Sequence, residues 1–279
     1  MKSNFIQRTI TGIVFVAVLV GGIIGGPVSF SILFAVITAL TVYEFGTIVG
    51  KQDGVRINRA VCALAGVFLY FGFAYIGVAP GHNEVLIPYL FLLIYLMVSE
   101  LYLKRKNPLN NIAYTMMSQM YIALPFSLLN VLAFHTDLTG SVSEYNPILP
   151  LSIFIFTWVN DTGAYCTGVL FGKHRLFERI SPKKSWEGSI GGGAFSVIAA
   201  AVLAHFFPFM PLGVWIGLGL TIVVFGTWGD LTESLLKRTL GIKDSGNILP
   251  GHGGMLDRFD STLMAVPASV VYLYLISIL

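Results

Sequence analysis

The amino-acid sequence predicts an all-α polytopic membrane protein with about nine transmembrane helices. Of its 279 residues, 55% are hydrophobic and only 11% are charged, and the mean hydropathy is +0.78. A soluble domain carries roughly 25% charged residues, so the composition indicates a lipid environment. Long apolar runs give the same indication, because about 20 predominantly apolar residues span a bilayer.

Nine apolar segments are long enough to span, with a boundary uncertainty of several residues. They cover residues 9–26, 28–49, 60–79, 85–103, 112–134, 148–171, 188–207, 211–229 and 262–279. The first follows Lys2 and Arg8, as the apolar region of a signal peptide does. Because no A-x-A cleavage site follows and more apolar segments come directly after, we expect a retained span.

The distribution of charge supports this count of spans. With nine spans, all 17 Lys and Arg residues fall on one side of the membrane, in the N-terminus and in the loops after spans two, four, six and eight. The opposite loops contain Glu84, Asp137 and Glu144 and no basic residue. The positive-inside rule therefore predicts a cytoplasmic N-terminus and an external C-terminus.

We predict a single integral-membrane domain over residues 1–279, since no internal repeat or linker is visible. Residues 1–147 contribute mainly N-terminal spans, and residues 148–279 contribute the spans and loops that carry the polar motifs. Cys62 and Cys166 both fall inside apolar segments, where we expect buried, inert thiols and neither a disulfide framework nor a metal site.

Asp161 lies inside the sixth predicted span, in the stretch WVNDTGAYCTGVLFGKH. A charge at the centre of a membrane helix costs about 2.5–3.5 kcal/mol, so such a residue is a candidate for function. The alternative is a protonated or hydrogen-bonded Asp that joins helices. Gly168 and Gly172 form a G-x-x-x-G step, which is typical of helix packing. The stretch lacks the spacer and the hydroxyl residue of a P-loop.

A second polar stretch, RISPKKSWEGSIGGG, precedes the seventh predicted span. We expect Pro182 to start a turn and Gly188 to open the helix, with Glu187 near its N-terminus, where a carboxylate is favoured. Lys183 and Lys184 would suit a polyphosphate. The alternative is a basic loop that only sets the topology.

Four carboxylates mark the third polar region. Asp230 and Glu233 are spaced i,i+3, as are Asp257 and Asp260, so each pair lies on one helical face. Such a group repels itself unless a cation lies between its members. Oxygen ligands of this kind are what Mg²⁺ binds, usually together with substrate phosphates. No His or Cys cluster favours zinc instead.

Between these pairs lies the glycine-rich stretch KDSGNILPGHGGMLDRFDS. Its glycines allow positive φ and close approach of the backbone to a ligand, and successive N–H groups form anion-binding nests. We expect the last helix to open between Met255 and Asp260. A cation, basic side chains and an N–H-lined loop together indicate polyphosphate chemistry. The alternative is a polar loop whose glycines only make turns.

The segment Ser234–Asp260 resembles the signature of bacterial-type phosphatidate cytidylyltransferases, also called CDP-diacylglycerol synthases. That signature reads S-x-x-K-R-x₄-K-D followed by P-G-H-G-G-x-x-D-R-x-D, and each fixed position is present. The upstream stretches DTGAY, FGKH and SPKKSWEG are also similar to that family. The N-terminal half matches only in its run of spans and in Glu44, which lies near the end of the second span.

The resemblance implies transfer of CMP from CTP to phosphatidic acid, which gives CDP-diacylglycerol and pyrophosphate in phospholipid biosynthesis. It also implies Mg²⁺, a possible second cation, a homodimer, no nucleic-acid partner, and an active site on the cytoplasmic face of a bacterial inner membrane. One alternative is another Mg²⁺-dependent membrane phosphotransferase. A transporter is the non-enzymatic alternative, but the paired broken segments expected in two halves of such a fold are absent.

Site residues follow from the resemblance together with the charge pattern. Asp230 and Asp257 are the expected metal ligands, with Asp244 and Asp260 as second-metal or supporting ligands. Four basic residues are expected to hold phosphates and count with Asp230 and Asp257 as catalytic: Lys237, Arg238, Lys243 and Arg258. The expected substrate-binding residues are Lys183, Lys184, Ser234, Gly251, His252, Gly253 and Gly254. Three acidic residues are expected to support the site: Asp161, Glu187 and Glu233.

Overall fold

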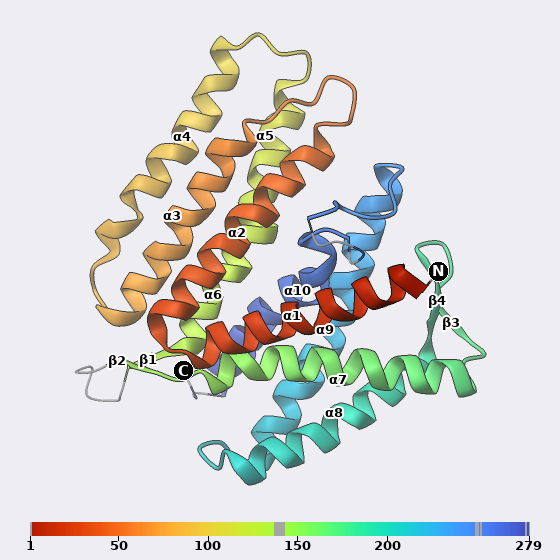
Figure 1. Cartoon of the computed structure of the whole chain (residues 1–279). Helices are drawn as coiled ribbons and strands as arrows, with labels where there is room; N and C mark the ends of the chain where they lie inside the picture. The colour runs from red at the N-terminus through yellow and green to blue at the C-terminus, as the bar shows by residue number, and fades with distance from the viewer. Residues whose placement is uncertain (1, 137–142, 249–250, 252, 277, 279) are drawn as a thin grey trace. The chain divides into compact units, whose positions relative to one another are not determined.

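The computed structural model of the chain describes residues 2–136, 143–248, 251, 253–276 and 278. Helices form almost all of its regular structure, which confirms the predicted all-α class (Figure 1). The helices are α1 (Lys2–Ile24), α2 (Pro27–Val49), α3 (Arg59–Val78), the 3₁₀ helix η1 (Asn83–Leu86), α4 (Ile87–Tyr102), α5 (Pro108–Met117), the π-helical turn η2 (Ser118–Ala123), α6 (Leu124–Ala133), α7 (Ile148–Phe171), α8 (Trp186–Phe206), α9 (Leu212–Thr239) and α10 (Leu256–Leu275).

Six helical segments among the described residues are long and apolar enough to cross a membrane. They are Pro27–Val49, Arg59–Val78, Asn83–Tyr102, Pro108–Ala133, Trp186–Phe206 and Leu212–Thr239, which match six of the nine predicted spans. The other three predicted spans are also helical, as α1, α7 and α10. In α1 only the shorter stretch Thr9–Ile24 is apolar. Asn160 and Asp161 interrupt the apolar run of α7. The protein is an integral membrane protein.

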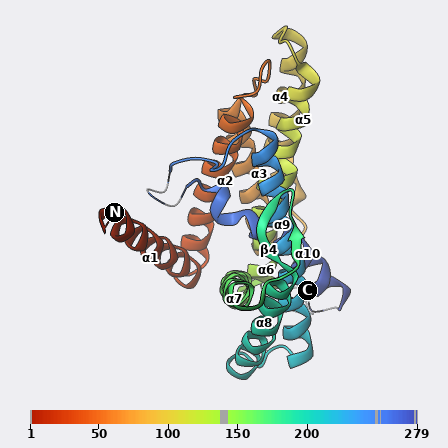
Figure 2. The same cartoon turned by 90° about the vertical axis from the view of Figure 1, so that its right-hand side faces the viewer.

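The chain forms two compact units. The first comprises Met1–Ile148 and Thr239–Phe259. In it, α2, α3, α4 and α6 pack side by side, as both views of the molecule show (Figure 2). Aromatic side chains fill its core: the rings of Phe126 and Phe259 lie 5.2 Å apart, and Phe15 packs on Phe259 at 5.7 Å. The first turn of α10 is thereby anchored between α1 and α6.

The second unit comprises Leu149–Arg238 and Asp260–Leu279. Its helices α7 and α8 are joined by a hairpin of β3 (Arg175–Phe177) and β4 (Ser181–Ser185). The two helices approach closely because α8 presents glycine to α7: a Cβ on Gly192 would lie 2.3 Å from Asn160 Oδ1. Small residues at helix contacts are the usual means of such an approach in membranes. Buried Trp215 of α9 packs on Phe156 of α7.

The hairpin corrects one sequence-based expectation. Pro182 does not start a turn but lies within β4, which pairs with β3 in antiparallel register between Phe177 and Ser181. A proline is tolerated there because this two-stranded sheet has only edge strands. The helix that follows begins at Trp186 rather than Gly188, since the Ser185 side chain caps it by accepting the Gly188 N–H at 3.1 Å.

Two further differences concern features that sequence patterns do not reveal. Cys62 is buried as expected, whereas Cys166 is exposed on α7. A second short hairpin, of β1 (Phe134–Thr136) and β2 (Ser143–Tyr145), precedes α7. An apolar run fixes that a residue lies in a span but not which side of the helix it occupies, and therefore the exposure of Cys166 was not predictable.

Candidate functional site

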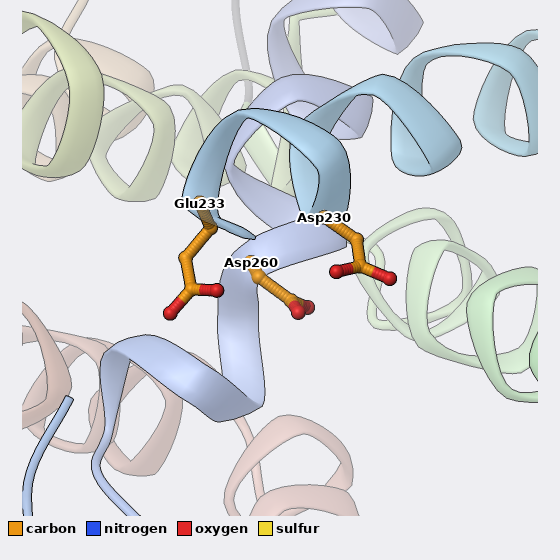
Figure 3. A group of neighbouring side chains, drawn as sticks. All are labelled: Asp230, Glu233 and Asp260. Carbon is orange, nitrogen blue, oxygen red and sulfur yellow. The ribbon is translucent and has the colours of Figure 1, made fainter. Parts of the chain in front are cut away.

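Three carboxylates from two helices converge in the second unit (Figure 3). Asp230 and Glu233 lie one turn apart on α9, and Asp260 projects from α10 between them. One oxygen of each lies within 4.8 Å of the others. We call these residues the acidic group. Its all-oxygen donor set is the one that hard divalent cations prefer.

The acidic group depends on a close approach of α10 to α9. Gly229 precedes Asp230, and a Cβ at this position would lie 2.5 Å from the Asp260 carbonyl oxygen and 3.2 Å from the Ser261 Cα. Both are backbone atoms, so a side chain could not be accommodated by rotation of a neighbour. The lack of a side chain at Gly229 therefore sets the position of Asp260 next to Asp230.

Two lysines partly neutralise the acidic group. Lys184 of β4 lies 2.6 Å from Asp230 Oδ2, and Lys237 lies 2.6 Å from Glu233 Oε2, one turn along α9. Glu233 is fully buried. Ser234 Oγ donates to Asp230 Oδ1 at 3.2 Å. The lysines reduce the repulsion between the carboxylates in the absence of a cation.

Asp260, which precedes the last predicted span, has a carboxyl group with a raised pKa. Burial first, and then the carboxylates of Asp230 and Asp161, raise the pKa of Asp260 to about 7, against the effect of Lys184. A raised pKa means that the site binds a proton more readily than a free carboxylate does. A divalent cation would take the place of that proton, because it satisfies the same excess of negative charge.

A second carboxylate arrangement lies in the first unit, at the glycine-rich loop. Asp257 Oδ2 accepts the Ser245 N–H at 2.9 Å and the Gly254 N–H at 2.8 Å. Glu44 of α2 accepts the Ser245 hydroxyl at 2.5 Å and the N–H groups of Met255 and Leu256 at 3.0 Å each. Each carboxylate thus bonds both ends of the segment Ser245–Leu256. We call this arrangement the loop clamp.

The loop clamp requires glycine at its closest point. A Cβ on Gly254 would lie 2.1 Å from both Glu44 Oε1 and the Ser245 hydroxyl. Glu44 and Ser245 are each 5% exposed, so the Glu44 carboxylate is stabilised by its hydrogen bonds rather than by water. Glu44 matches the family pattern but had no expected role, and Ser245 was not among the expected site residues. A carboxylate near the end of an apolar span is the signal that could have identified Glu44.

The predicted site residues divide between the two units. The first contains Asp257, Asp244, Lys243, Arg258, Gly251, Gly253 and Gly254, and the second contains Asp230, Glu233, Asp260, Lys183, Lys184, Ser234, Lys237, Arg238, Asp161 and Glu187. Of the four expected metal ligands, the acidic group unites Asp230 and Asp260 and adds Glu233. Asp257 is instead part of the loop clamp, and Asp244 is exposed. His252 lies outside the described residues.

Glu187 occupies the first turn of α8, as the sequence predicts. Its carboxylate accepts the N–H groups of Lys173 and His174 at 3.1 and 3.2 Å and lies 2.6 Å from His174 Nδ1. It therefore holds the end of α7 against the start of α8. This contact positions the β3–β4 hairpin, which carries Lys183 and Lys184.

Comparison with known proteins gives the family. The sequence model of the Cytidylyltransferase family matches residues 6–276. The chain belongs to this family. Phosphatidate cytidylyltransferases of Staphylococcus aureus (strain COL) and Staphylococcus haemolyticus (strain JCSC1435) are 50% and 51% identical to it over 119 residues. That stretch is 42% of this chain and 45% of each relative, so the match spans less than half the relatives' length. The family resemblance of the signature is thus confirmed.

Gly229→Ala tests the approach of α10 to α9 in this cytidylyltransferase-family chain. Overpacking costs about 1–3 kcal/mol, so we expect cation affinity to fall at least about tenfold, as measured by calorimetric titration of the purified protein with Mg²⁺. Gly213→Ala, on the same helix with no atom within 4 Å of the added Cβ, is the matched control. Equal affinities of the two variants would contradict the assignment.

Glu44→Gln tests the loop clamp. The amide places an N–H₂ group opposite a backbone donor, and a buried donor left without an acceptor costs about 1–3 kcal/mol. We expect a lower thermal unfolding midpoint and faster hydrogen exchange at the Gly254 amide. Glu84→Gln, at an exposed glutamate that pairs with His82, should leave both unchanged. An unaltered exchange rate at Gly254 in the Glu44 variant would refute the clamp.

Proposed function

We propose that the protein transfers CMP from CTP to phosphatidic acid and releases pyrophosphate. The observation that carries this proposal is the acidic group, formed within a chain of the Cytidylyltransferase family by the aspartates of its signature segment and its flank. The names of the relatives supply the substrate class. Staphylococcal relatives favour a bacterial plasma membrane, and the basic loops favour a cytoplasmic N-terminus and active site.

The reaction needs little covalent chemistry from the protein. A phosphate oxygen of phosphatidic acid attacks the α-phosphorus of CTP, the bond to the bridging oxygen breaks, and pyrophosphate leaves with the electron pair. The attacking phosphate is already anionic, so no strong general base is required. Two unit charges about 4 Å apart repel by roughly 4 kcal/mol at an effective dielectric of 20. The task of the site is therefore to align two anions and to offset their repulsion.

The residues of the chain fit that task. The acidic group has the donor set for Mg²⁺, which would supply positive charge to the phosphates when bound. Asp257 and Asp244 remain proposed ligands of a first or second cation. Arg238, Lys243 and Arg258 would bind phosphate oxygens, joined by Lys183, Lys184 and Lys237. Gly251 and Gly253 have φ of 75° and 84° and would present backbone N–H groups to the nucleotide, with His252 between them. We further propose a homodimer, on family resemblance alone.

Asp230→Asn is the direct test of this function. The variant keeps the shape of the side chain but loses its charge, and we expect Mg²⁺-dependent formation of a lipid-soluble cytidine product to fall about 100-fold. Labelled CTP, phosphatidic acid and purified protein suffice for the measurement, and chelation of Mg²⁺ should abolish wild-type turnover. Asp53→Asn, at an exposed aspartate paired with Lys106, is the control. Consumption of a CDP-linked substrate without use of CTP would favour the alternative phosphotransferase.

Arg258→Lys tests whether a bidentate guanidinium donor is needed in the first turn of α10. Lysine keeps the charge but cannot form paired bonds to one phosphate. We expect kcat/KM for CTP to fall at least about tenfold, measured by steady-state release of pyrophosphate. Arg56→Lys, at an exposed arginine in another loop of the same unit, should retain wild-type kinetics. Unchanged kinetics of the Arg258 variant would remove this side chain from the phosphate-binding set.

A further inference from the structure

A cavity of about 450 Å³ opens in the second unit beside the acidic group. Its walls come from α7, the β3–β4 hairpin, the first turn of α8 and one residue of α9. Lys184 lines the cavity and forms the ion pair with Asp230, so this lysine connects the cavity wall to the acidic group. This volume lies in the range of sites for small organic ligands. We call it the hairpin cavity.

The hairpin cavity carries an excess of positive charge. Arg175, Lys183 and Lys184 line it against a single acidic residue, Asp161. Lys184 forms an ion pair with Asp230, which lies outside the cavity lining. Arg175 and Lys183 are exposed, and neither forms an ion pair with a carboxylate in the part of the chain that the structure describes. Two cationic side chains therefore remain for an anionic ligand.

A buried amide in the cavity wall also lacks a partner. Asn160 of α7 is 7% exposed, and its Oδ1 atom has no hydrogen-bond partner among the described residues. Its Oδ1 atom lies against Gly192 of α8, while the residue itself lines the cavity. Buried polar atoms in native proteins are nearly always hydrogen-bonded, and an exception calls for a ligand or water. Asn160 thus offers a neutral polar contact beside the cations.

The remaining wall is apolar and exposed. Tyr165 and Val169 of α7 line the cavity and are 72% and 68% exposed. The exposed apolar surface continues along α7 to Leu170 and Phe171. A contiguous exposed apolar surface of this kind is typical of a site of contact with membrane lipid. The cavity therefore joins a cationic end to a wall along which acyl chains can lie without entering water.

We propose that the hairpin cavity binds the phosphate-bearing headgroup of the lipid substrate, with Arg175 and Lys183 on the phosphate and Asn160 on the adjoining polar atoms. The inference rests on the proposed function and deepens it by assigning the lipid, rather than the nucleotide, to this cavity. A lipid phosphate held at Arg175 would share the cavity with Lys184, the ion-pair partner of Asp230. Arg175 is a binding residue that the signature does not include.

Arg175→Gln and Lys183→Gln test the assignment, with binding of dioctanoyl phosphatidic acid and of CTP measured separately by calorimetry on the full chain in detergent. We expect lipid affinity to fall about tenfold in each variant, as for loss of a charge-assisted hydrogen bond, and CTP affinity to stay within about twofold. Arg179→Gln is the matched control, since Arg179 is exposed in the turn of the same hairpin and does not line the cavity. Arg175→Lys should restore part of the lipid affinity.

Two results would overturn the inference: lipid affinity unchanged in both glutamine variants, or weaker CTP binding with lipid binding intact. Dioctanoylglycerol, which lacks the phosphate, should bind the wild type and the variants alike. Because the measurement needs no turnover, its outcome is separate from that of the proposed function. A wild type that binds the lipid at this cavity but never transfers CMP would refute the function alone. A wild type that turns over, with variants of unaltered lipid affinity, would refute the cavity assignment alone.

Discussion

Repulsion among three carboxylates within 4.8 Å of one another is the constraint around which the second unit is organised. Each pair of unit charges at such separations costs about 4 kcal/mol at an effective dielectric of 20. Lys184 and Lys237 offset part of this repulsion through ion pairs. The raised pKa of Asp260 favours a proton on its carboxyl group, which removes one of the negative charges. The lack of a side chain at Gly229 lets α10 approach α9 closely enough to bring these carboxylates together. A divalent cation bound among the three carboxylates would offset the repulsion that remains.

The first unit uses carboxylates for a different purpose. Glu44 and Asp257 accept backbone N–H groups and one hydroxyl. Helix N-termini favour negative charge, so both acids also stabilise the start of α10. Carboxylates thus fasten a loop through N–H donors in the first unit, whereas in the second unit they lie together beside lysines and form the proposed cation site.

Much of the fold could be predicted from the sequence, because a bilayer imposes a length and an apolar composition on each span. The pairing of Asp230 with Glu233 also follows from helical spacing alone. The addition of Asp260 does not, since it depends on how α10 packs on α9 through Gly229. The role of Glu44 was hidden for the same reason: its partners lie about 200 residues away. The β3–β4 hairpin escaped prediction because its proline resembles a turn signal.

The loop clamp also sets where the last helix begins. Side chains fasten the segment Ser245–Leu256 near both of its ends. Glu44 and Asp257 each bond Ser245 together with a backbone N–H beside the start of α10, so loss of either carboxylate would loosen both ends at once. The segment and the first turn of α10 should therefore open as one cooperative unit rather than residue by residue.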